Sequence, residues 1–286
     1  MNLFIFGLGY SCRHFLDRFA GANISGTVRD AARSPGRHDC ETLSFGPDRT
    51  DPAIAARLAA ADVLLVSVPP STAGDLVVAR FGETLATSRI QRIVYLSTLG
   101  VYGDHHGEWI DETAPVAASS GRRRARTDAE AAWMRLAPER TTILRLAGIY
   151  GPGRNALINL RAGTARRIVK PGQVFNRIHV DDIARTIAAA IASDRTGIWN
   201  VCDNEPAPPQ DIVTFAAELM GVAPPPEIDF ANAELSDMAR SFYATSNRVS
   251  NARLKRDLKI DLAYPTYRDG LRALWAAGEG ADTLSK

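Results

Sequence analysis

The chain begins with the apolar run Asn2-Leu-Phe-Ile-Phe6, and the stretch Gly7-Leu-Gly9-Tyr-Ser-Cys12 follows it directly. Apolar residues then recur at helical spacing at Phe15, Leu16 and Phe19. An apolar run that stops at two glycines and leads into a helical pattern is typical of a strand, a tight turn and the start of a helix. We therefore expect a β-strand followed by an α-helix at the start of the chain.

The two glycines have the spacing of a dinucleotide-binding turn. In such a unit the first glycine forms the turn, the second lets the backbone approach a pyrophosphate, and the third lets the helix pack on the strand. Gly7 and Gly9 take the first two positions, whereas the third is Cys12, a small residue that is often buried. Free N–H groups at the helix start would face the anion. The alternative is an ordinary strand-to-helix turn, but the place of the motif after the first strand favours a nucleotide. The predicted cofactor contacts here are Gly7, Leu8, Gly9, Tyr10, Ser11 and Cys12.

A second predicted strand, Asn23–Val28, leads to Arg29 and Asp30, about where a dinucleotide-binding unit reads the ribose. An acidic residue at this point accepts hydrogen bonds from the 2′-hydroxyl of NAD. A guanidinium instead pairs with the 2′-phosphate of NADP, because its planar fork matches phosphate geometry. We favour NADP with Arg29 as its contact and Arg33 in support. Asp30 keeps NAD as the alternative, and either charge also suits a solvated loop.

The composition points to a soluble cytoplasmic protein. The 286 residues allow one large or two smaller domains, and a hydrophobic content of 45% is ample for a core. A net charge of +2 predicts no general attraction to nucleic acid or membrane. The three cysteines lack metal-ligand spacing and suit a reducing compartment better than a disulfide framework. We expect no metal site.

Predicted strands and helices alternate regularly through the first half of the chain. Strands are expected at 41–45, 62–68 and 92–97, and helices at 52–61 and 74–86. This alternation favours parallel βαβ units, and therefore a doubly wound α/β sheet with helices on both faces. Ligands of such sheets bind at the carboxyl ends of the strands. We therefore add Ser67, Val68 and Pro69 to the predicted cofactor contacts; Pro69 also ends its strand, because proline cannot extend the ladder.

From Ser97-Thr-Leu-Gly-Val-Tyr-Gly103 onward, a set of motifs follows in a fixed order. The others lie at 142–153, 177–184, 197–203, 247–254 and 264–271. Taken in order, they resemble the extended short-chain dehydrogenase/reductases, the NAD-dependent epimerase/dehydratase family, over almost the whole chain. The resemblance implies a Rossmann domain formed by residues 1–154 and 174–203. It also implies a smaller C-terminal substrate domain formed by residues 155–173 and 204–286.

Members of this family usually carry Tyr-x-x-x-Lys on the helix after the Thr98 strand. The tyrosine exchanges a proton with the substrate oxygen, and the lysine lowers the pKa of the phenol and holds the ribose. Alignment on Glu130 puts Arg122 at the tyrosine position and Arg126 at the lysine position. None of the seven tyrosines is followed by lysine four residues later. The chain therefore resembles the atypical branch of the family, in which this pair is lost.

The resemblance also implies roles for individual residues. Thr98 would orient a carbonyl, and Arg126 would hold the ribose. Arg122 would bind an oxyanion or carboxylate, but it cannot act as an acid near neutrality, because a guanidinium does not release its proton in proteins. The predicted catalytic residues are Thr98, Arg122, Arg126 and Tyr102, and the predicted substrate-binding residues are Tyr150 and Arg177.

Each of these residues also has a purely structural interpretation. Thr98 would satisfy the backbone at a strand end, the arginines would form a solvated helix face, and the tyrosines would pack in the core. Arg177 would pair with Asp181 or Asp182, which we expect to cap a helix at 183–192.

The predicted function is that of an NAD(P)-binding protein of epimerase, dehydratase or reductase type, with altered or lost hydride-transfer chemistry. Its substrate would be a small molecule, anionic or linked to a nucleotide. The alternative, favoured by the missing Tyr and Lys, is a non-catalytic NADP(H)-sensing regulatory or scaffold protein. Family members often dimerise through the helix that carries the Tyr-x-x-x-Lys pair, so a homodimer is compatible with the sequence.

Overall fold

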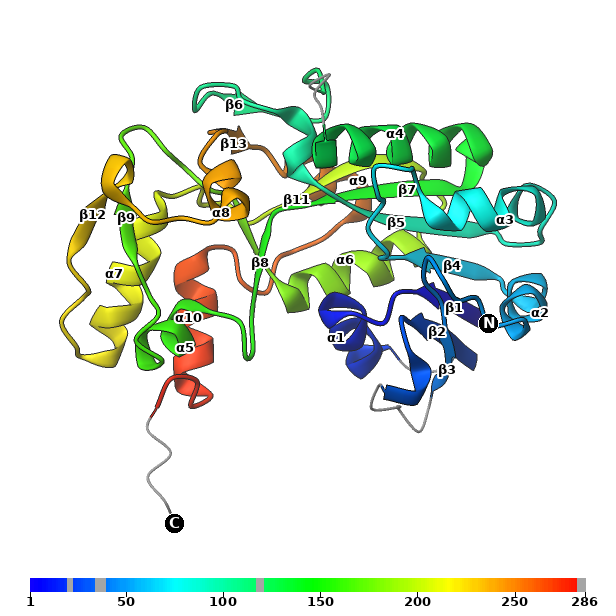
Figure 1. Cartoon of the computed structure of the whole chain (residues 1–286), viewed down its shortest axis with the longest axis horizontal. Helices are drawn as coiled ribbons and strands as arrows, with labels where there is room; N and C mark the ends of the chain where they lie inside the picture. The colour runs from blue at the N-terminus through cyan, green and yellow to red at the C-terminus, as the bar shows by residue number, and fades with distance from the viewer. Residues whose placement is uncertain (20–22, 34–39, 117–120, 282–286) are drawn as a thin grey trace, which may run out of the picture.

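The structure is a computed structural model, and it describes residues 1–19, 23–33, 40–116 and 121–281 (Figure 1). Its centre is a seven-stranded sheet in the order β11-β7-β5-β4-β1-β2-β3, in which every neighbouring pair is parallel. The strands are β1 (Asn2–Phe6), β2 (Asn23–Val28), β3 (Cys40–Ser44), β4 (Val63–Val66), β5 (Arg92–Thr98), β7 (Thr141–Leu146) and β11 (Gly197–Val201). The predicted doubly wound α/β fold is confirmed, with β3 and β4 slightly displaced or shortened relative to prediction.

Helices cover both faces of the sheet because successive side chains of a strand point to opposite sides. Leu3 and Ile5 of β1 belong to one apolar cluster, with helices α1 (Tyr10–Arg18), α6 (Val180–Ala192) and α9 (Ala252–Leu258). Phe4 and Phe6 belong to the other, with α2 (Ala53–Ala60), α3 (Leu76–Ala86) and α4 (Gly121–Leu136). Figure 1 shows α3 and α4 above the sheet and α1 and α6 below it.

The strand order reverses between β1 and β4, which are direct neighbours with Phe6 beside Val66. The chain proceeds outward from β1 through β2 to β3 on one side, and from β4 through β5 on the other. Such a reversal opens a crevice at the carboxyl ends of the two strands, where ligands of open α/β sheets bind. The glycine turn after β1 lies at this crevice.

A smaller group of elements lies to the left of the sheet in Figure 1. Helices α5 (Ala156–Arg161), α7 (Pro209–Met220) and α10 (Tyr267–Ala276) share an apolar cluster of their own. A further cluster joins β9 (Arg167–Val169), β12 (Glu227–Asp229) and the segment that includes α8 (Asp237–Phe242). The remaining short strands are β6 (Trp109–Ile110), β8 (Gly148–Tyr150), β10 (Arg177–His179) and β13 (Arg248–Val249). The predicted domain boundaries stay a prediction.

The start of α6 differs from the prediction. The helix begins at Val180, and its N-cap is His179, whose Nδ1 accepts the N–H of Asp181 at 3.2 Å. Asp181 pairs with Arg18 at 2.5 Å, and Asp182 accepts two backbone N–H groups from the segment before α10. The prediction that these aspartates cap the helix is therefore wrong, because both lie within its first turn.

A buried polar network fixes helix α4 on the sheet. The Glu130 carboxylate lies 2.7 Å from the guanidinium of Arg145 on β7, and both side chains are 5% exposed. The hydroxyl of Ser97 on β5 donates to the same carboxylate at 2.5 Å. The Arg145 guanidinium also lies 4.7 Å from the ring centroid of Tyr102. Removal of one member would leave a buried charge unpaired, which is costly.

We predict that Glu130→Gln lowers the free energy of unfolding by about 3–5 kcal/mol, because Arg145 stays buried without its counter-charge. Urea denaturation measures the change. The matched control is Asp128→Asn on the same helix, since Asp128 pairs with Arg124 at 3.5 Å in an exposed position. The control should change stability by less than about 1 kcal/mol. Equal effects of the two substitutions would contradict the prediction.

Candidate functional site

Gly7 forms the turn after β1 in a conformation that favours glycine. Its φ is +95°, and a Cβ atom there would lie 3.2 Å from the backbone nitrogen of Val68. Its own N–H donates to the Thr27 hydroxyl at 3.0 Å, and the Leu8 N–H donates to the Thr27 carbonyl at 2.8 Å. The turn is therefore held on one side by β2 and packed on the other against the end of β4.

Gly9 is the N-cap of α1, and it faces open space. A Cβ atom added there would meet nothing within 4 Å. No side chain caps the helix, and the first intrahelical bond runs from the Arg13 N–H to the Gly9 carbonyl at 2.9 Å. The N–H groups of Tyr10, Ser11 and Cys12 precede that bond and have no intrahelical acceptor. This arrangement fits a pyrophosphate, because free N–H groups and the helix dipole both attract an anion.

Two predicted cofactor contacts turn their side chains inward. Leu8 packs over Gly26 of β2, where a Cβ atom would come within 2.8 Å of the leucine side chain. Cys12 is fully buried and hydrogen-bonds with Ser67, and its burial raises the pKa of the thiol to about 12. Their backbones, not their side chains, are available to a cofactor. Cys12 takes the packing role expected of the third glycine.

Tyr10 connects the glycine turn to the loop after β8. Its hydroxyl donates to the carbonyl of Pro152 at 2.9 Å, and the Arg154 guanidinium lies 5.9 Å from its ring centroid. Burial raises the pKa of this phenol to about 12. Tyr10 therefore holds two loops together beside the crevice.

The charged residues after β2 differ in whether they have hydrogen-bond or ion-pair partners. Asp30 accepts the N–H of Ala32 at 3.1 Å and lies 3.7 Å from the guanidinium of Arg49. Arg29 and Arg33 are both exposed. The carboxylate that would accept a 2′-hydroxyl is therefore already hydrogen-bonded, whereas the Arg29 guanidinium is open to solvent.

A cleft of about 920 Å³ opens next to this crevice, between the sheet and α8. Loops after β4 and β5 form its base with Pro69, Pro70, Thr98 and Gly100. Helix α4 lines one wall with Arg122, Arg123 and Arg126. The opposite wall consists of Asp237, Met238, Ser241 and Phe242 from α8, with Thr245. Three of the four predicted catalytic residues, Thr98, Arg122 and Arg126, therefore line one cleft together with the predicted cofactor contact Pro69.

These three side chains differ in how firmly they are held. The Thr98 hydroxyl oxygen accepts the Gly100 N–H at 3.2 Å, which leaves its own proton available to a ligand. Arg126 donates to the Leu96 carbonyl at 3.1 Å and to the Tyr95 hydroxyl at 3.2 Å. Arg122 is exposed at the rim of the cleft. The cleft thus contains one hydrogen-bonded and one exposed guanidinium beside a hydroxyl.

The prediction that Tyr102 supplies a catalytic phenol conflicts with its position in the structure. The residue is 1% exposed, and its hydroxyl donates to the Asn200 side chain at 2.7 Å in the core. Burial raises the pKa of the phenol above its usual value. Tyr102 therefore belongs to the buried network under α4 and does not reach the cleft.

Tyr150 and Arg177, the predicted substrate contacts, also lie outside the cleft lining. Tyr150 is buried against Gly270 of α10, which has no side chain and so leaves room for the phenol. The Arg177 guanidinium donates to the carbonyls of Phe175 at 2.9 Å and Ala207 at 3.2 Å. Burial lowers the pKa of Arg177 to about 10. Both residues hold the C-terminal elements together, and Arg177 is not ion-paired with Asp181 or Asp182.

The sequence did not predict the α8 wall. Met238 and Phe242 on this wall are 52% and 62% exposed. A pair of apolar residues four positions apart in a short polar helix was the available signal. The signal is weak, because single exposed apolar residues are common on protein surfaces.

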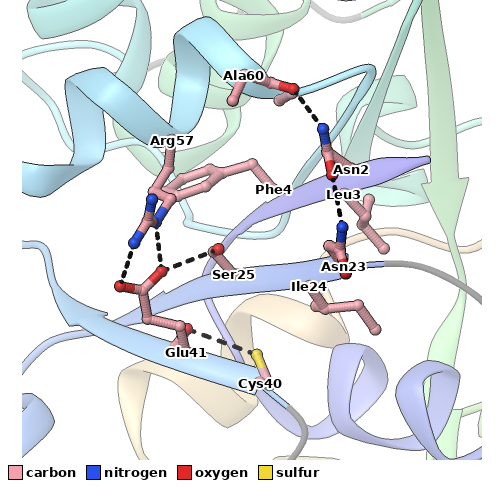
Figure 2. Close-up of a pocket in the computed structure, with 11 residues that line it drawn as sticks. Asn2, Leu3, Phe4, Asn23, Ile24, Ser25, Cys40, Glu41, Arg57 and Ala60 are labelled. Carbon is pink, nitrogen blue, oxygen red and sulfur yellow. Dashed lines mark hydrogen bonds and ion pairs between the residues drawn. The ribbon is translucent and has the colours of Figure 1, made fainter.

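A second hollow, of about 500 Å³, lies at the amino ends of β1, β2 and β3 (Figure 2). Figure 2 shows Arg57 bound to Glu41, which also accepts the hydroxyl of Ser25 at 3.1 Å. The Asn2 side chain donates to the Ala60 carbonyl at 2.9 Å. These polar groups already have protein partners. The hollow also lies at the amino ends of the strands, whereas the crevice lies at their carboxyl ends. We therefore do not consider it the functional site.

The residues that the structure describes contain no group of three or more His, Cys, Asp or Glu residues placed to hold a metal ion. No helix among them is long and apolar enough to cross a membrane.

Comparisons with known proteins agree with this geometry. The model of the NAD dependent epimerase/dehydratase family matches residues 76–202. A conserved protein of unknown function from Silicibacter pomeroyi has a similar structure, with 42% identity and a TM-score of 0.87, over 97% of this chain and 99% of that one. A structure from Methylobacillus flagellatus, described as a candidate NAD-dependent epimerase/dehydratase, has 28% identity and a TM-score of 0.73, over 97% and 98%. A 3-diazoavenalumate denitrifying reductase from a Streptomyces species is 27% identical over 89% of this chain and 92% of its own length.

More distant structures share the fold. A UDP-glucose 4-epimerase from Thermotoga maritima, solved with UDP-glucose, has 16% identity and a TM-score of 0.76, covering 95% of this chain and 96% of its own. A human epimerase family protein solved with NADPH has 16% identity and a TM-score of 0.70, covering 99% of this chain and 100% of its own. Fold and glycine turn are those of an NAD(P)-binding Rossmann protein. Residues 76–202 of the chain are therefore similar to the NAD-dependent epimerase/dehydratase family.

We predict that the protein binds NADPH more tightly than NADH and that Arg29→Ala removes most of this preference. Loss of a charge-assisted hydrogen bond to the 2′-phosphate, about 1.5–3 kcal/mol, corresponds to a ten- to hundredfold weaker affinity for NADPH. NADH affinity should be unchanged. Fluorescence titration with both cofactors measures the two dissociation constants. Equal affinities in the unmodified protein would favour Asp30 and NAD instead.

Proposed function

We propose that this protein binds NADP(H) at the glycine turn and acts as an oxidoreductase with altered hydride-transfer chemistry. The observation that carries the proposal is the open space at Gly9, in front of an uncapped helix start and beside the cleft that contains Thr98 and Arg126. A dinucleotide with its pyrophosphate at α1 would extend along the carboxyl ends of β1 and β4 toward Pro69. Its nicotinamide end would then lie at the base of the cleft.

The bound cofactor would supply or accept a hydride. The residues of the chain would hold the cofactor and stabilise the charge that develops on the substrate. Arg126 retains N–H donors beyond the two it uses, and these can hold the ribose hydroxyls. The Thr98 hydroxyl can donate to the substrate atom on which negative charge develops. The arginines can stabilise that charge without losing a proton, since a guanidinium stays protonated in proteins.

Proton supply is where the proposed chemistry departs from that of the family. The described residues that line the cleft include no Tyr, Lys or His. Of the predicted phenols, Tyr102 donates to Asn200 and Tyr150 packs against α10. A proton needed to complete the reduction would therefore come from water. The relative named as a reductase is consistent with a reductive role for this branch.

The second candidate function is a non-catalytic NADP(H) sensor. The same lack of a Tyr, Lys or His in the described cleft lining favours it. In that case the cofactor would bind as proposed, and its occupancy would change the cleft without turnover. The two candidates share the glycine turn and differ only in whether NADPH is consumed.

We predict that Gly9→Val abolishes dinucleotide binding while the protein stays folded. The valine side chain would enter the open space where the pyrophosphate is expected, but it would meet no protein atom. Calorimetric titration with NADPH should show at least about a hundredfold loss of affinity, which is about 2.7 kcal/mol. The melting temperature without cofactor should be unchanged. Unaltered binding of both NAD and NADP by the folded variant would show that the assignment is wrong.

The two candidate functions can be separated with a small-molecule cell extract. If the protein is an oxidoreductase, we expect NADPH to be oxidised in the presence of extract and protein, as measured by loss of the reduced-nicotinamide absorbance. Gly9→Val should remove this oxidation, and Arg124→Gln, which lies outside the cleft lining, should retain it. NADPH binding without any protein-dependent oxidation would support the sensor.

A further inference from the structure

Two large apolar side chains on one short helix are left exposed at the cleft. Met238 and Phe242 lie four residues apart on α8, so they share a helix face, and both line the cleft opposite α4. Their exposed fractions are 52% and 62%. An aromatic ring beside a thioether forms an apolar surface on which a planar group can pack, since sulfur and ring edges attract each other.

The facing wall carries an excess of positive charge. Arg122, Arg123 and Arg126 line it, and Asp237 is the one carboxylate among the described lining residues. Arg126 is bound to Leu96 and Tyr95, whereas Arg122 and Arg123 form no ion pair within the described residues. A cleft with this charge distribution attracts anions. An exposed guanidinium without an ion-pair partner, as at Arg122, can bind a carboxylate through two parallel hydrogen bonds.

The rest of the lining is poorly suited to a sugar. It offers the hydroxyls of Thr98, Ser241 and Thr245, and the described lining contains no Asn, Gln, Glu or His. A sugar ring would place several hydroxyl groups against Met238, Phe242 and the two prolines at the base. Polar groups that lose water without gaining a hydrogen-bond partner are unfavourable.

We propose that the substrate of this cleft is an aryl carboxylate, with its ring on Met238 and Phe242 and its carboxylate on Arg122. The proposal rests on the proposed function, because the nicotinamide end of the cofactor would form the floor of the same cleft. Charge and apolar surface face each other across the cleft, so a molecule with an acidic end and an aromatic body complements both walls. Helix α8 then determines specificity for the aromatic ring of the substrate, and α4 determines specificity for its carboxylate.

The test is calorimetric titration of the full chain, with and without saturating NADPH. The probes are trans-cinnamate, phenylpyruvate and benzoate as aryl carboxylates, cinnamyl alcohol as the uncharged counterpart, and UDP-glucose as the sugar nucleotide. We expect at least one aryl carboxylate to bind at least about tenfold more tightly than cinnamyl alcohol and UDP-glucose.

Two substitutions and two matched controls locate the binding. Arg122→Gln should weaken aryl carboxylate binding about ten- to hundredfold, whereas Arg124→Gln on the same helix should have no effect. Phe242→Ser should weaken it about tenfold, whereas Val222→Ser, at another exposed apolar position, should not. All four positions are exposed, so we expect the variants to fold.

Several outcomes would overturn the proposal. These are failure of every aryl carboxylate to bind, equal binding of cinnamyl alcohol, tighter binding of UDP-glucose, or equal effects of a variant and its control. NADPH titration of the same samples separates this failure from that of the proposed function. If NADPH binds and no aryl carboxylate does, only the substrate class is wrong. If NADPH does not bind, the proposed function fails, whatever the aryl carboxylates do.

Discussion

The buried contact between Glu130 and Arg145 is the constraint on which the arrangement of the cleft depends. Neither charge is stable in the core without the other, so α4 can pack on the sheet only in the register that joins them. Ser97 on β5 adds a second point of attachment to the same carboxylate. Arg126 and Arg122 precede Glu130 by four and eight residues, which places them on the same side of the helix. The contact in the core thereby directs two guanidinium groups toward the end of β5.

The sheet could be predicted from the sequence because its signals are local. Apolar runs, the two glycines and the regular return of helices require no knowledge of distant partners, and Gly7 indeed has the backbone conformation that such a turn demands. The roles of the tyrosines could not be predicted in this way. Tyr102 is held by Asn200, a residue 98 positions away, and Tyr150 by the absence of a side chain at Gly270. A phenol next to a glycine turn looks the same in sequence whether it faces a ligand or the core.

The N-cap of α6 and the α8 wall of the cleft also could not be predicted from local sequence signals. Asp181 and Asp182 have the composition of a helix cap, but Arg18 and the backbone before α10 compete for their carboxylates, and His179 takes the cap. The apolar pair on α8 has functional interest only because α4 lies opposite, more than a hundred residues earlier in the chain. Residue propensity and spacing predict where helices and strands form. The role of a side chain depends in addition on which other element it contacts.

A cleft that is rich in arginine and has no Tyr, Lys or His in its described lining suits a particular kind of chemistry. Fixed cations lower the energy of developing negative charge, but they do not deliver a proton. A reduction under these conditions is easiest when the acceptor can spread the added charge over its own conjugated system until water protonates it. An aryl carboxylate with a carbon–carbon double bond conjugated to its ring, as in trans-cinnamate, is such an acceptor, because that bond can take the hydride and then a proton from water. Its ring on Met238 and Phe242 and its carboxylate on Arg122 would keep the bond in one orientation over the cofactor. The proposed substrate class is therefore consistent with the predicted loss of the Tyr-x-x-x-Lys pair, since both rely on fixed positive charge in place of a proton donor.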